Sequence, residues 1–403
     1  MLYTFHKSIR RFRCSGIEMI GDSESGIIIG LSDEGVRLVD EILHMKSIDV
    51  QSLSPDAQFL LTEMQGASFF DTDNVITSPC NVAYFHVTSK CNLNCVGCYS
   101  YEESRNEIVD MPLADVHKVL SNIRNAGVSH LVISGGEPML RTDICDILIY
   151  AKRECRFSKI TLISNGIVPK ERYERILGLI DEISISIEGY DEISSFIRNG
   201  SVQTVLNTVK FLSSVHAPVN MIVTLHKRNL NHVANYIRLS QDLRVPFTFS
   251  LLTVPQGSEC NGCELDQSDY SLIEAALEKF PLPLSDVPFA GDLGCRVSCG
   301  LGKTIISVSS NGKVFPCHML QDESFCIGNA LIEDIKDCVN QHTPWNVEQI
   351  IECNDCEVKY LCGGGCYARR IFNSKNINSS HDPCCEMYKS GILATLKRAI
   401  QAE

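Results

Sequence analysis

The sequence predicts an α/β protein in which a partial (β/α)6 barrel lies between a small N-terminal domain and a cysteine-rich C-terminal domain. Three observations lead to this prediction. Short β-branched runs alternate with amphipathic helical stretches through the middle of the chain. Two strands and two helices precede that region, and about half of the 20 cysteines follow it. The expected domain boundaries are 1–78, 79–285 and 286–403.

The N-terminal region is expected to form two strands and two helices. The strands are predicted around Phe12 to Ile20 and Gly26 to Leu31. Ser32 and Ser54 are candidate N-caps, and Pro55 suits a first helical turn. The expected apolar faces are Val36, Val39 and Leu43 in the first helix and Phe59, Leu60 and Met64 in the second. The polar segment 71–79 reads as a linker.

Six strand candidates separated by helical patterns favour right-handed βα units around a parallel sheet. The expected strands are Ala83 to Val87, His130 to Ser134, Ile160 to Ser164, Ile183 to Ile187, Asn220 to Leu225 and Phe247 to Leu252. Helical patterns between them include 116–127 and 201–212. Six such units make an open, TIM-like barrel whose chemistry belongs at the C-terminal ends of the strands.

Composition excludes several classes of partner. A net charge of -13, without a basic run, disfavours nucleic acid and anionic membranes. No apolar stretch approaches the length that crosses a bilayer. The first residues carry bases but no apolar signal core, so a cytoplasmic location is expected. Thiols are kept reduced there, so the cysteines suggest metal ligation or catalysis more than disulfides.

Three cysteines, Cys91, Cys95 and Cys98, follow directly on the first barrel strand. A structural zinc site needs four protein ligands, whereas an iron–sulfur cluster held by three cysteines keeps one iron open. A zinc loop or scattered core thiols are the alternatives. The run CxxxCxxC with an aromatic residue next, here Tyr99, resembles the signature of the radical SAM superfamily. That resemblance implies a 4Fe-4S cluster whose open iron binds S-adenosylmethionine, which is then cleaved to a 5′-deoxyadenosyl radical.

Polar motifs at the next strand ends strengthen the resemblance. Glycines at a strand end allow a ligand close to the backbone. SGGEP resembles the superfamily's motif for the methionyl amino group. SNG at 164–166 and SISIEG at 184–189 follow the next two strands or lie at their ends, and they resemble positions near the ribose and the methionyl carboxylate. An arginine in SFIRNG is a candidate to pair with that carboxylate. The implied cofactor contacts are Tyr99, Gly135, Gly136, Glu137, Pro138, Ser164, Asn165, Ser186 and Arg198.

The C-terminal region contains a predicted hairpin and a regular series of cysteines. Asn311-Gly312 between two β-type runs favours a type I′ turn. The cysteine spacing resembles that of a SPASM domain, which carries two auxiliary 4Fe-4S clusters. The resemblance implies Cys295, Cys299, Cys317 and Cys366 for the first cluster. For the second it implies Cys353, Cys356, Cys362 and one of the pair Cys384 and Cys385.

Two ligand questions stay open at this point. Cys385 is favoured over Cys384, because CEMYK resembles the closing segment of a SPASM domain. Cys260 and Cys263 form a further CxxC pair, which could replace Cys295 in the first auxiliary site or have no such role. The other cysteines are interpreted as buried apolar or incidental thiols.

The layout of the N-terminal region resembles the winged-helix-type element that recognises precursor peptides in enzymes modifying ribosomally made peptides. Such an element binds a leader peptide as an added strand. An accessory domain that only covers the barrel is the alternative. The leading hypothesis is therefore a peptide maturase that forms a C–C, C–O or thioether cross-link, with a flavodoxin or ferredoxin as electron donor. The alternatives are formylglycine formation of the anaerobic sulfatase-maturase type and a non-catalytic protein organised by zinc.

Overall fold

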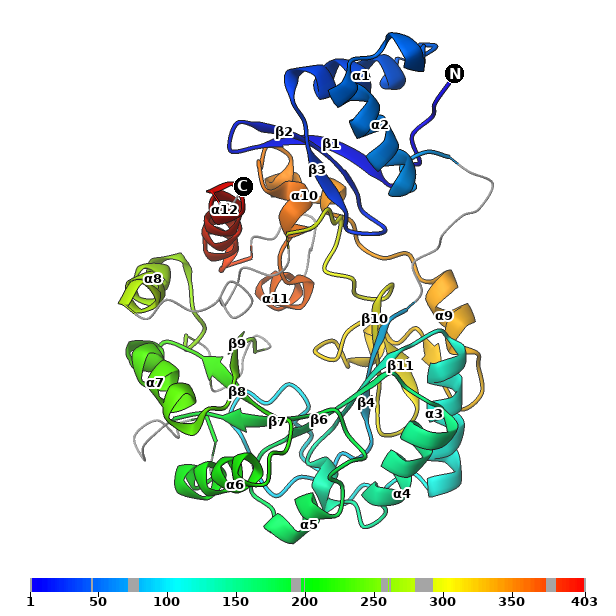
Figure 1. Cartoon of the computed structure of the whole chain (residues 1–403). Coiled ribbons are helices and arrows are strands. Elements are labelled where there is room, and N and C mark those ends of the chain that lie inside the picture. Colours follow the sequence, from blue (N-terminus) through cyan, green and yellow to red (C-terminus); the bar gives the residue numbers. More distant parts are fainter. Residues whose placement is uncertain are drawn as a thin grey trace.

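The computed structural model describes residues 2–44, 46–71, 80–189, 197–198, 200–254, 260, 262–279, 293–374 and 382–401. Most of the predicted linker lies outside these residues. A long sheet with helices on its outer side forms the body of the molecule, and a small antiparallel sheet with two helices stands at one end (Figure 1).

The six predicted barrel strands form a continuous parallel sheet, and each boundary falls within one residue of the prediction. Their order in the sheet follows the chain, as right-handed βα units require. The strands are β4 (Val82–His86), β5 (His130–Ser134), β6 (Lys159–Ser164), β7 (Glu182–Ile187), β8 (Val219–Leu225) and β9 (Phe247–Leu251).

The helices of the βα units cover the outer face of this sheet (Figure 1). They are α3 (Leu113–Asn125), α4 (Ile144–Ile149), α5 (Lys170–Glu174), α6 (Val202–Ser214), α7 (Val233–Leu243) and α8 (Tyr270–Lys279). Ser201 caps α6 by accepting the N–H of Thr204, and α3 buries Val116, Val119 and Ile123 at helical spacing. The main core lies between this helical layer and the sheet.

The N-terminal domain contains β1 (Ile9–Cys14), β2 (Ile17–Asp22), β3 (Ile28–Gly30), α1 (Asp33–Leu43) and α2 (Pro55–Gly66). The first predicted strand is in fact two strands. Ser15 and Gly16 both have positive φ, 49° and 81°, and close a tight turn between β1 and β2. This turn was missed because Ser-Gly is a weaker hairpin signal than Asn-Gly.

The predicted starts of α1 and α2 are confirmed, but the predicted apolar faces are partly wrong. Ser32 and Ser54 accept the N–H groups of Gly35 and Ala57. Val39 and Met64 are fully buried, as expected. Leu43 and Phe59 are instead 51% and 67% exposed. The buried faces of the two helices instead include Leu38 and Ile42 of α1 and Ala57 and Leu61 of α2. These side chains share one apolar cluster with Ile20 of β2.

The C-terminal domain begins with β10 (Ile305–Val308), β11 (Lys313–Phe315) and β12 (Gly328–Asn329). The predicted hairpin joins β10 to β11, but the type I′ turn is wrong, because Gly312 has positive φ (86°) and Asn311 does not. Strand β10 pairs in parallel with β4 and extends the barrel sheet to nine strands. The hairpin therefore lies beside the strand that leads into the Cys91–Cys98 loop.

The remaining helices are α9 (Ile335–Gln341), α10 (Lys359–Cys362), α11 (Tyr367–Asn373) and α12 (Cys385–Gln401). The N-terminal sheet packs against α10 and α12, where Met19 shares an apolar cluster with Leu361 and Ile392. Ion pairs between Arg10 and Glu348 and between Lys303 and Glu24 join the same two domains. The N-terminal domain thus rests on the C-terminal domain.

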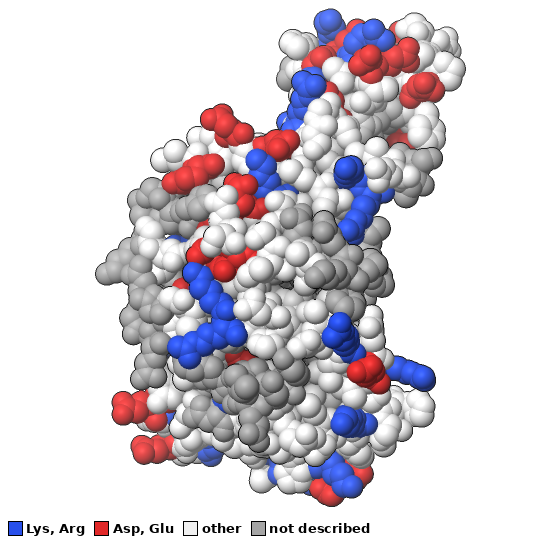
Figure 2. All heavy atoms as spheres, turned by 90° about the vertical axis from the view of Figure 1, so that its left-hand side faces the viewer, with Lys and Arg blue, Asp and Glu red and all other residues white. Residues whose placement is uncertain are grey.

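Among the described residues, no helix combines the length and apolar character needed to span a bilayer. On the face shown in Figure 2, acidic and basic side chains are interspersed.

Candidate active site

Cys91, Cys95 and Cys98 lie in the loop after β4 and line one cavity of about 550 Å³. The cavity extends into the barrel, where hydroxyl and amide side chains such as Thr161, Asn220 and Thr248 face it. All 20 cysteines of the chain are free, so these thiols are available as ligands. Three thiols and an open interior thus meet at the C-terminal edge of the sheet, where the sequence predicted the site.

The thiol loop is fixed by hydrogen bonds to its own continuation and to neighbouring segments. The N–H of Cys91 donates to the side-chain oxygen of Asn106 at 2.9 Å. The N–H of Val96 donates to the carbonyl of Ile197 at 2.8 Å. These contacts hold the backbone between the cysteines without using the thiols.

Two arginines influence the charge state of the thiols. Burial raises the pKa of Cys95 to about 11, and the guanidinium of Arg198 opposes that rise. Burial likewise raises the pKa of Cys91, and Arg105 opposes it. Because metals bind the thiolate, both cations favour the ligating form.

Gly135 and Gly136 also line the cavity, but their packing gives another reason for glycine here. A Cβ at Gly136 would stand 2.2 Å from the carbonyl oxygen of Lys90, and one at Gly135 would stand 2.3 Å from that of Thr88. The N–H groups of Gly136 and Glu137 donate to these two carbonyls, to Thr88 and Lys90 respectively, each at 2.8 Å. The glycines therefore let the second strand end pack against the start of the thiol loop.

The carboxylate of Glu137 is fully buried and does not face the main cavity. It accepts the N–H of Asn165 at 2.7 Å, the N–H of Met139 at 3.0 Å and the hydroxyl of Ser164 at 3.0 Å. Burial raises its pKa, which these hydrogen bonds oppose. Glu137 thus ties the ends of β5 and β6 together, and Pro138, in the short turn after it, does not line the cavity either.

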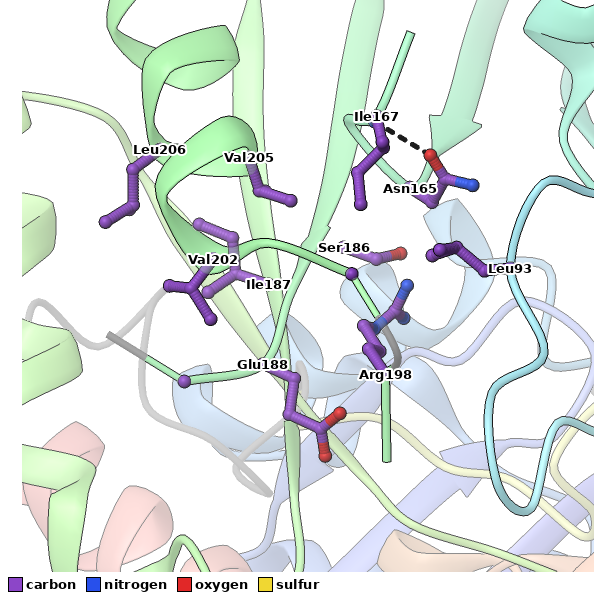
Figure 3. Close-up of a pocket in the computed structure, with 12 residues that line it drawn as sticks. Leu93, Asn165, Ile167, Ser186, Ile187, Glu188, Arg198, Val202, Val205 and Leu206 are labelled. Carbon is purple, nitrogen blue, oxygen red and sulfur yellow. Dashed lines mark hydrogen bonds between the residues drawn. The ribbon is translucent and has the colours of Figure 1, made fainter. Parts of the chain in front are cut away.

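The remaining predicted contacts meet at a smaller pocket that joins the main cavity. Asn165, Ser186 and Arg198 line both spaces. In Figure 3 the Arg198 guanidinium points toward the Ser186 hydroxyl, whereas the Glu188 carboxylate turns away. Asn165 donates to the side-chain oxygen of Asn92 at 2.8 Å, and so contacts the thiol loop. The apolar wall comes from Leu93, Ile167, Val202, Val205 and Leu206.

Residues 85–240 match the family model described as the Radical SAM superfamily. The chain carries a radical SAM domain. This match spans the strands that supply the three thiols, the Gly135–Gly136 segment and Arg198, and it confirms the resemblance seen in the sequence. The superfamily implies S-adenosylmethionine and a 4Fe-4S cluster, and the three free thiols around one cavity, next to two arginines, fit such a cluster.

Curated relatives match most of the chain that carries this domain. The AdoMet-dependent heme synthase of Methanosarcina barkeri is 25% identical over 340 residues, which are 76% of this chain and 96% of that protein. The subtilosin biosynthesis protein AlbA of Bacillus subtilis is 23% identical over 314 residues, 73% of this chain and 68% of that protein.

Solved structures share the fold. SuiB of Streptococcus suis bound to S-adenosylmethionine superposes with a TM-score of 0.60 at 17% identity, covering 95% of this chain and 100% of that one. A structure of anSMEcpe with bound AdoMet gives a TM-score of 0.66 at 17% identity, covering 80% of this chain and 95% of that one.

Cys299, Cys317 and Cys366 form a second group of thiols near the radical SAM domain. Burial raises the pKa of Cys317 to about 12, and the neighbouring Cys299 and Cys366 add to the rise. The structure does not bring Cys295 into this group. Its side chain is 2% exposed and packs against Gly21 of β2, and its N–H donates to Gly26 at 3.0 Å.

Aromatic rings connect the first thiol group to the second. Tyr99 follows Cys98, and His318 follows Cys317. The two rings meet edge to face with centroids 5.3 Å apart, and His318 also stacks on Tyr84 at 4.2 Å. The pairing of β10 with β4 brings these rings together, and this contact could not be predicted from the sequence.

Cys353, Cys356, Cys362 and Cys385 form a third group. Burial raises the pKa of Cys385 to about 12, and the other three thiols contribute to that rise. The thiol of Cys384 points elsewhere and donates to the carbonyl of Leu265 at 3.5 Å. Cys260 and Cys263 pack in an apolar cluster with Cys95 and Val96 of the thiol loop.

The separation of the cysteine doublet gives a direct prediction. Cys385→Ala is expected to remove about four irons per chain, the content of one cluster, because it deletes a member of the third group. Cys384→Ala is the matched control and should leave the iron content unchanged, since that thiol donates to the carbonyl of Leu265 and not to the third group. Iron and sulfide assays on anaerobically purified variants check this. Iron lost from Cys384→Ala but not from Cys385→Ala would reverse the assignment.

Within the described residues, no three His, Cys, Asp or Glu side chains converge tightly enough for a single metal ion. Ligands of a cubane cluster bind separate irons and stand further apart than ligands of one zinc ion. Sequence reasoning overlooked Arg105, which lines the main cavity beside the thiols. A lone arginine seven residues after the last motif cysteine carries no recognisable signal.

Proposed function

We propose that this protein is a peptide maturase that acts on a ribosomally made precursor peptide and forms an intramolecular cross-link. The main support is the cavity of about 550 Å³ in which three thiols face a polar barrel interior. The barrel lies between an N-terminal domain and a cysteine-rich C-terminal domain. The cross-link is a C–C or C–O bond to an aromatic ring or a thioether to a cysteine. Relatives named AlbA and PqqA peptide cyclase support action on a peptide.

Each group of site residues has an assigned role in this proposal. Cys91, Cys95 and Cys98 hold the 4Fe-4S cluster. Arg198 pairs with the methionyl carboxylate of S-adenosylmethionine. When bound, cofactor and cluster supply a 5′-deoxyadenosyl radical that removes a hydrogen atom from the peptide. The remaining cofactor contacts are Tyr99, Gly135, Gly136, Ser164, Asn165 and Ser186, with Glu137 and Pro138 shaping the strand end behind them.

The N-terminal domain, residues 1–78, is proposed to bind the leader part of the peptide. Among the described residues, β3 pairs with β2 on one side only, so its other edge is available to an added strand. A structure titled SuiB bound to precursor peptide SuiA covers 95% of this chain, which must include most of this domain. Residues 79–285 then form the catalytic barrel and residues 286–403 the SPASM domain.

The two C-terminal thiol groups are proposed to hold two auxiliary 4Fe-4S clusters, giving three in all. The peptide radical must lose one electron and one proton when the new bond forms. An auxiliary cluster is a suitable acceptor for that electron. A flavodoxin or ferredoxin is the proposed donor of the electron that starts the cycle. These reduced thiols also support a cytoplasmic location.

Formylglycine formation is the second candidate, because the anSMEcpe structure superposes with the higher TM-score, 0.66. That structure covers 80% of this chain, against 95% for SuiB. The additional coverage favours the enzyme class that carries an N-terminal domain. A zinc-organised protein without catalysis is the third candidate, and it requires zinc in place of iron.

The proposed function is tested with anaerobically purified protein, dithionite, S-adenosylmethionine and the small peptide encoded beside it. We expect deoxyadenosine and a peptide that has lost two hydrogen atoms, with the new bond located by tandem mass spectrometry. The same peptide without its leader is the control and should react much more slowly. An aldehyde at one cysteine or serine would support formylglycine formation instead. Zinc without iron, and no deoxyadenosine, would reject both enzyme readings.

A further inference from the structure

Arg105 is a buried cation that no carboxylate of the described residues pairs with. Its side chain is among the largest that are fully buried, with 2% of its surface exposed. No Asp or Glu within the described residues lies at ion-pair distance from it, although fifteen other ion pairs are present there. Buried charges are normally paired, so this guanidinium lacks an anion.

The contacts of Arg105 are all neutral. One terminal nitrogen donates to the carbonyl of Leu93 and, at 2.7 Å, to the side-chain oxygen of Asn94. The guanidinium carbon lies 5.0 Å from the centre of the Tyr101 ring. The Nε–H is buried and has no hydrogen-bond partner among the described residues. One terminal nitrogen of Arg105 thus holds the thiol loop.

The place of Arg105 indicates where its anion belongs. It lines the same cavity as Cys91, Cys95 and Cys98. A cluster ligated by three thiolates brings negative charge into this cavity, and hydrogen bonds to cluster sulfur adjust reduction potentials.

We propose that Arg105 is a positioning residue for the radical SAM cluster, holding the thiol loop through one terminal nitrogen and placing its buried positive charge beside the cluster. This inference rests on the 4Fe-4S cluster of the proposed function. Added negative charge on the cluster is stabilised by the nearby cation, so Arg105 raises the reduction potential.

The test measures a potential, which a purely structural role would leave unchanged. In Arg105→Met we expect the equilibrium constant for one-electron reduction of the radical SAM cluster to fall at least tenfold. That cluster is identified as the one whose spectroscopic signal responds to S-adenosylmethionine. For a one-electron couple, a tenfold fall is a shift of about 59 mV to more negative potential. In Arg105→Lys, which keeps the charge, most of the shift should be recovered. The potentials are measured by electron paramagnetic resonance in redox titrations.

Two further variants separate the charge from the loop contact. Asn94→Ala removes a loop contact of Arg105 and keeps its charge, so its potential should stay near the wild-type value. Arg124→Gln is the matched arginine control. Arg124 donates to the carbonyls of Cys155 at 3.1 Å and Val128 at 3.0 Å, and it does not line the cavity. It should not change the potential.

Several outcomes would overturn the inference. An unchanged potential in Arg105→Met would do so. If Arg105→Met retains no cluster, the comparison passes to Asn94→Ala, in which a shift of about 59 mV or more to negative potential would assign the effect to loop geometry alone. Absence of any iron in the wild-type protein would reject the proposed function itself, which is a different result from an unchanged potential.

Discussion

Replacing Cys91, Cys95 and Cys98 together by alanine is expected to abolish the cleavage of S-adenosylmethionine. The three thiols line one cavity and are the only ligands that the radical SAM assignment gives its cluster. Without them the cofactor has no iron to bind and no electron source. Deoxyadenosine is measured by chromatography after incubation with dithionite. We expect none above the rate seen without protein.

The same variant should keep the iron of the C-terminal thiol groups. About eight of about twelve irons are expected to remain, because each cubane cluster holds four. The matched control replaces Cys145, Cys155 and Cys326, which belong to none of the three groups, and it should keep both full iron content and deoxyadenosine formation. Cleavage that persists in the first variant would show that the cluster assignment is wrong.

The barrel could be predicted from the sequence because its signals are local. Buried parallel strands are short β-branched runs, and amphipathic helices separate them, so each of β4 to β9 was found within one residue. The chemistry followed from the fold rule that sites lie at the C-terminal strand ends. The loop of Cys91 to Cys98 and the residues Asn165 and Ser186 accordingly meet at one cavity.

Contacts between distant segments could not be predicted in the same way. Nothing in the sequence of β10 indicates that it pairs with β4, and this pairing decides that His318 contacts Tyr99. The roles of Gly136 and Glu137 also depend on such contacts, because both hold neighbouring loops and strand ends through the backbone. Motif spacing identifies such residues but does not reveal their partners.

The assignment of individual cysteines as ligands also depends on contacts that spacing does not reveal. Cys384 and Cys385 are equivalent by spacing, and only the direction in which each thiol leaves the start of α12 separates them. Cys295 was predicted as a ligand because it is the nearest upstream thiol. It packs against the N-terminal sheet, and the position of that sheet could not be predicted from the sequence. The fourth ligand of the first auxiliary group therefore could not be chosen from spacing.

Asp382→Asn is expected to destabilise the protein strongly and to lower its iron content. Asp382 is fully buried and forms a two-point ion pair with Arg369, at 2.7 and 3.2 Å. Its oxygens also accept the N–H groups of Cys366 at 2.8 Å and Cys384 at 3.0 Å. Removing one partner of a buried pair costs about 3–5 kcal/mol, since the other charge is left uncompensated. Anaerobic urea unfolding followed by circular dichroism measures the loss.

Two comparisons test whether the buried charge is the cause. Asp266→Asn removes a surface ion pair to Lys227, 2.6 Å long, and should cost less than about 1 kcal/mol. Combining Asp382→Asn with Arg369→Met removes both buried charges, so it should recover part of the stability that Asp382→Asn loses. Iron should fall in Asp382→Asn because Cys366 loses the acceptor that fixes its backbone. Equal free energies of unfolding for Asp382→Asn and Asp266→Asn would contradict the role of the buried charge. A double variant less stable than Asp382→Asn would assign the loss to the Cys366 and Cys384 contacts instead.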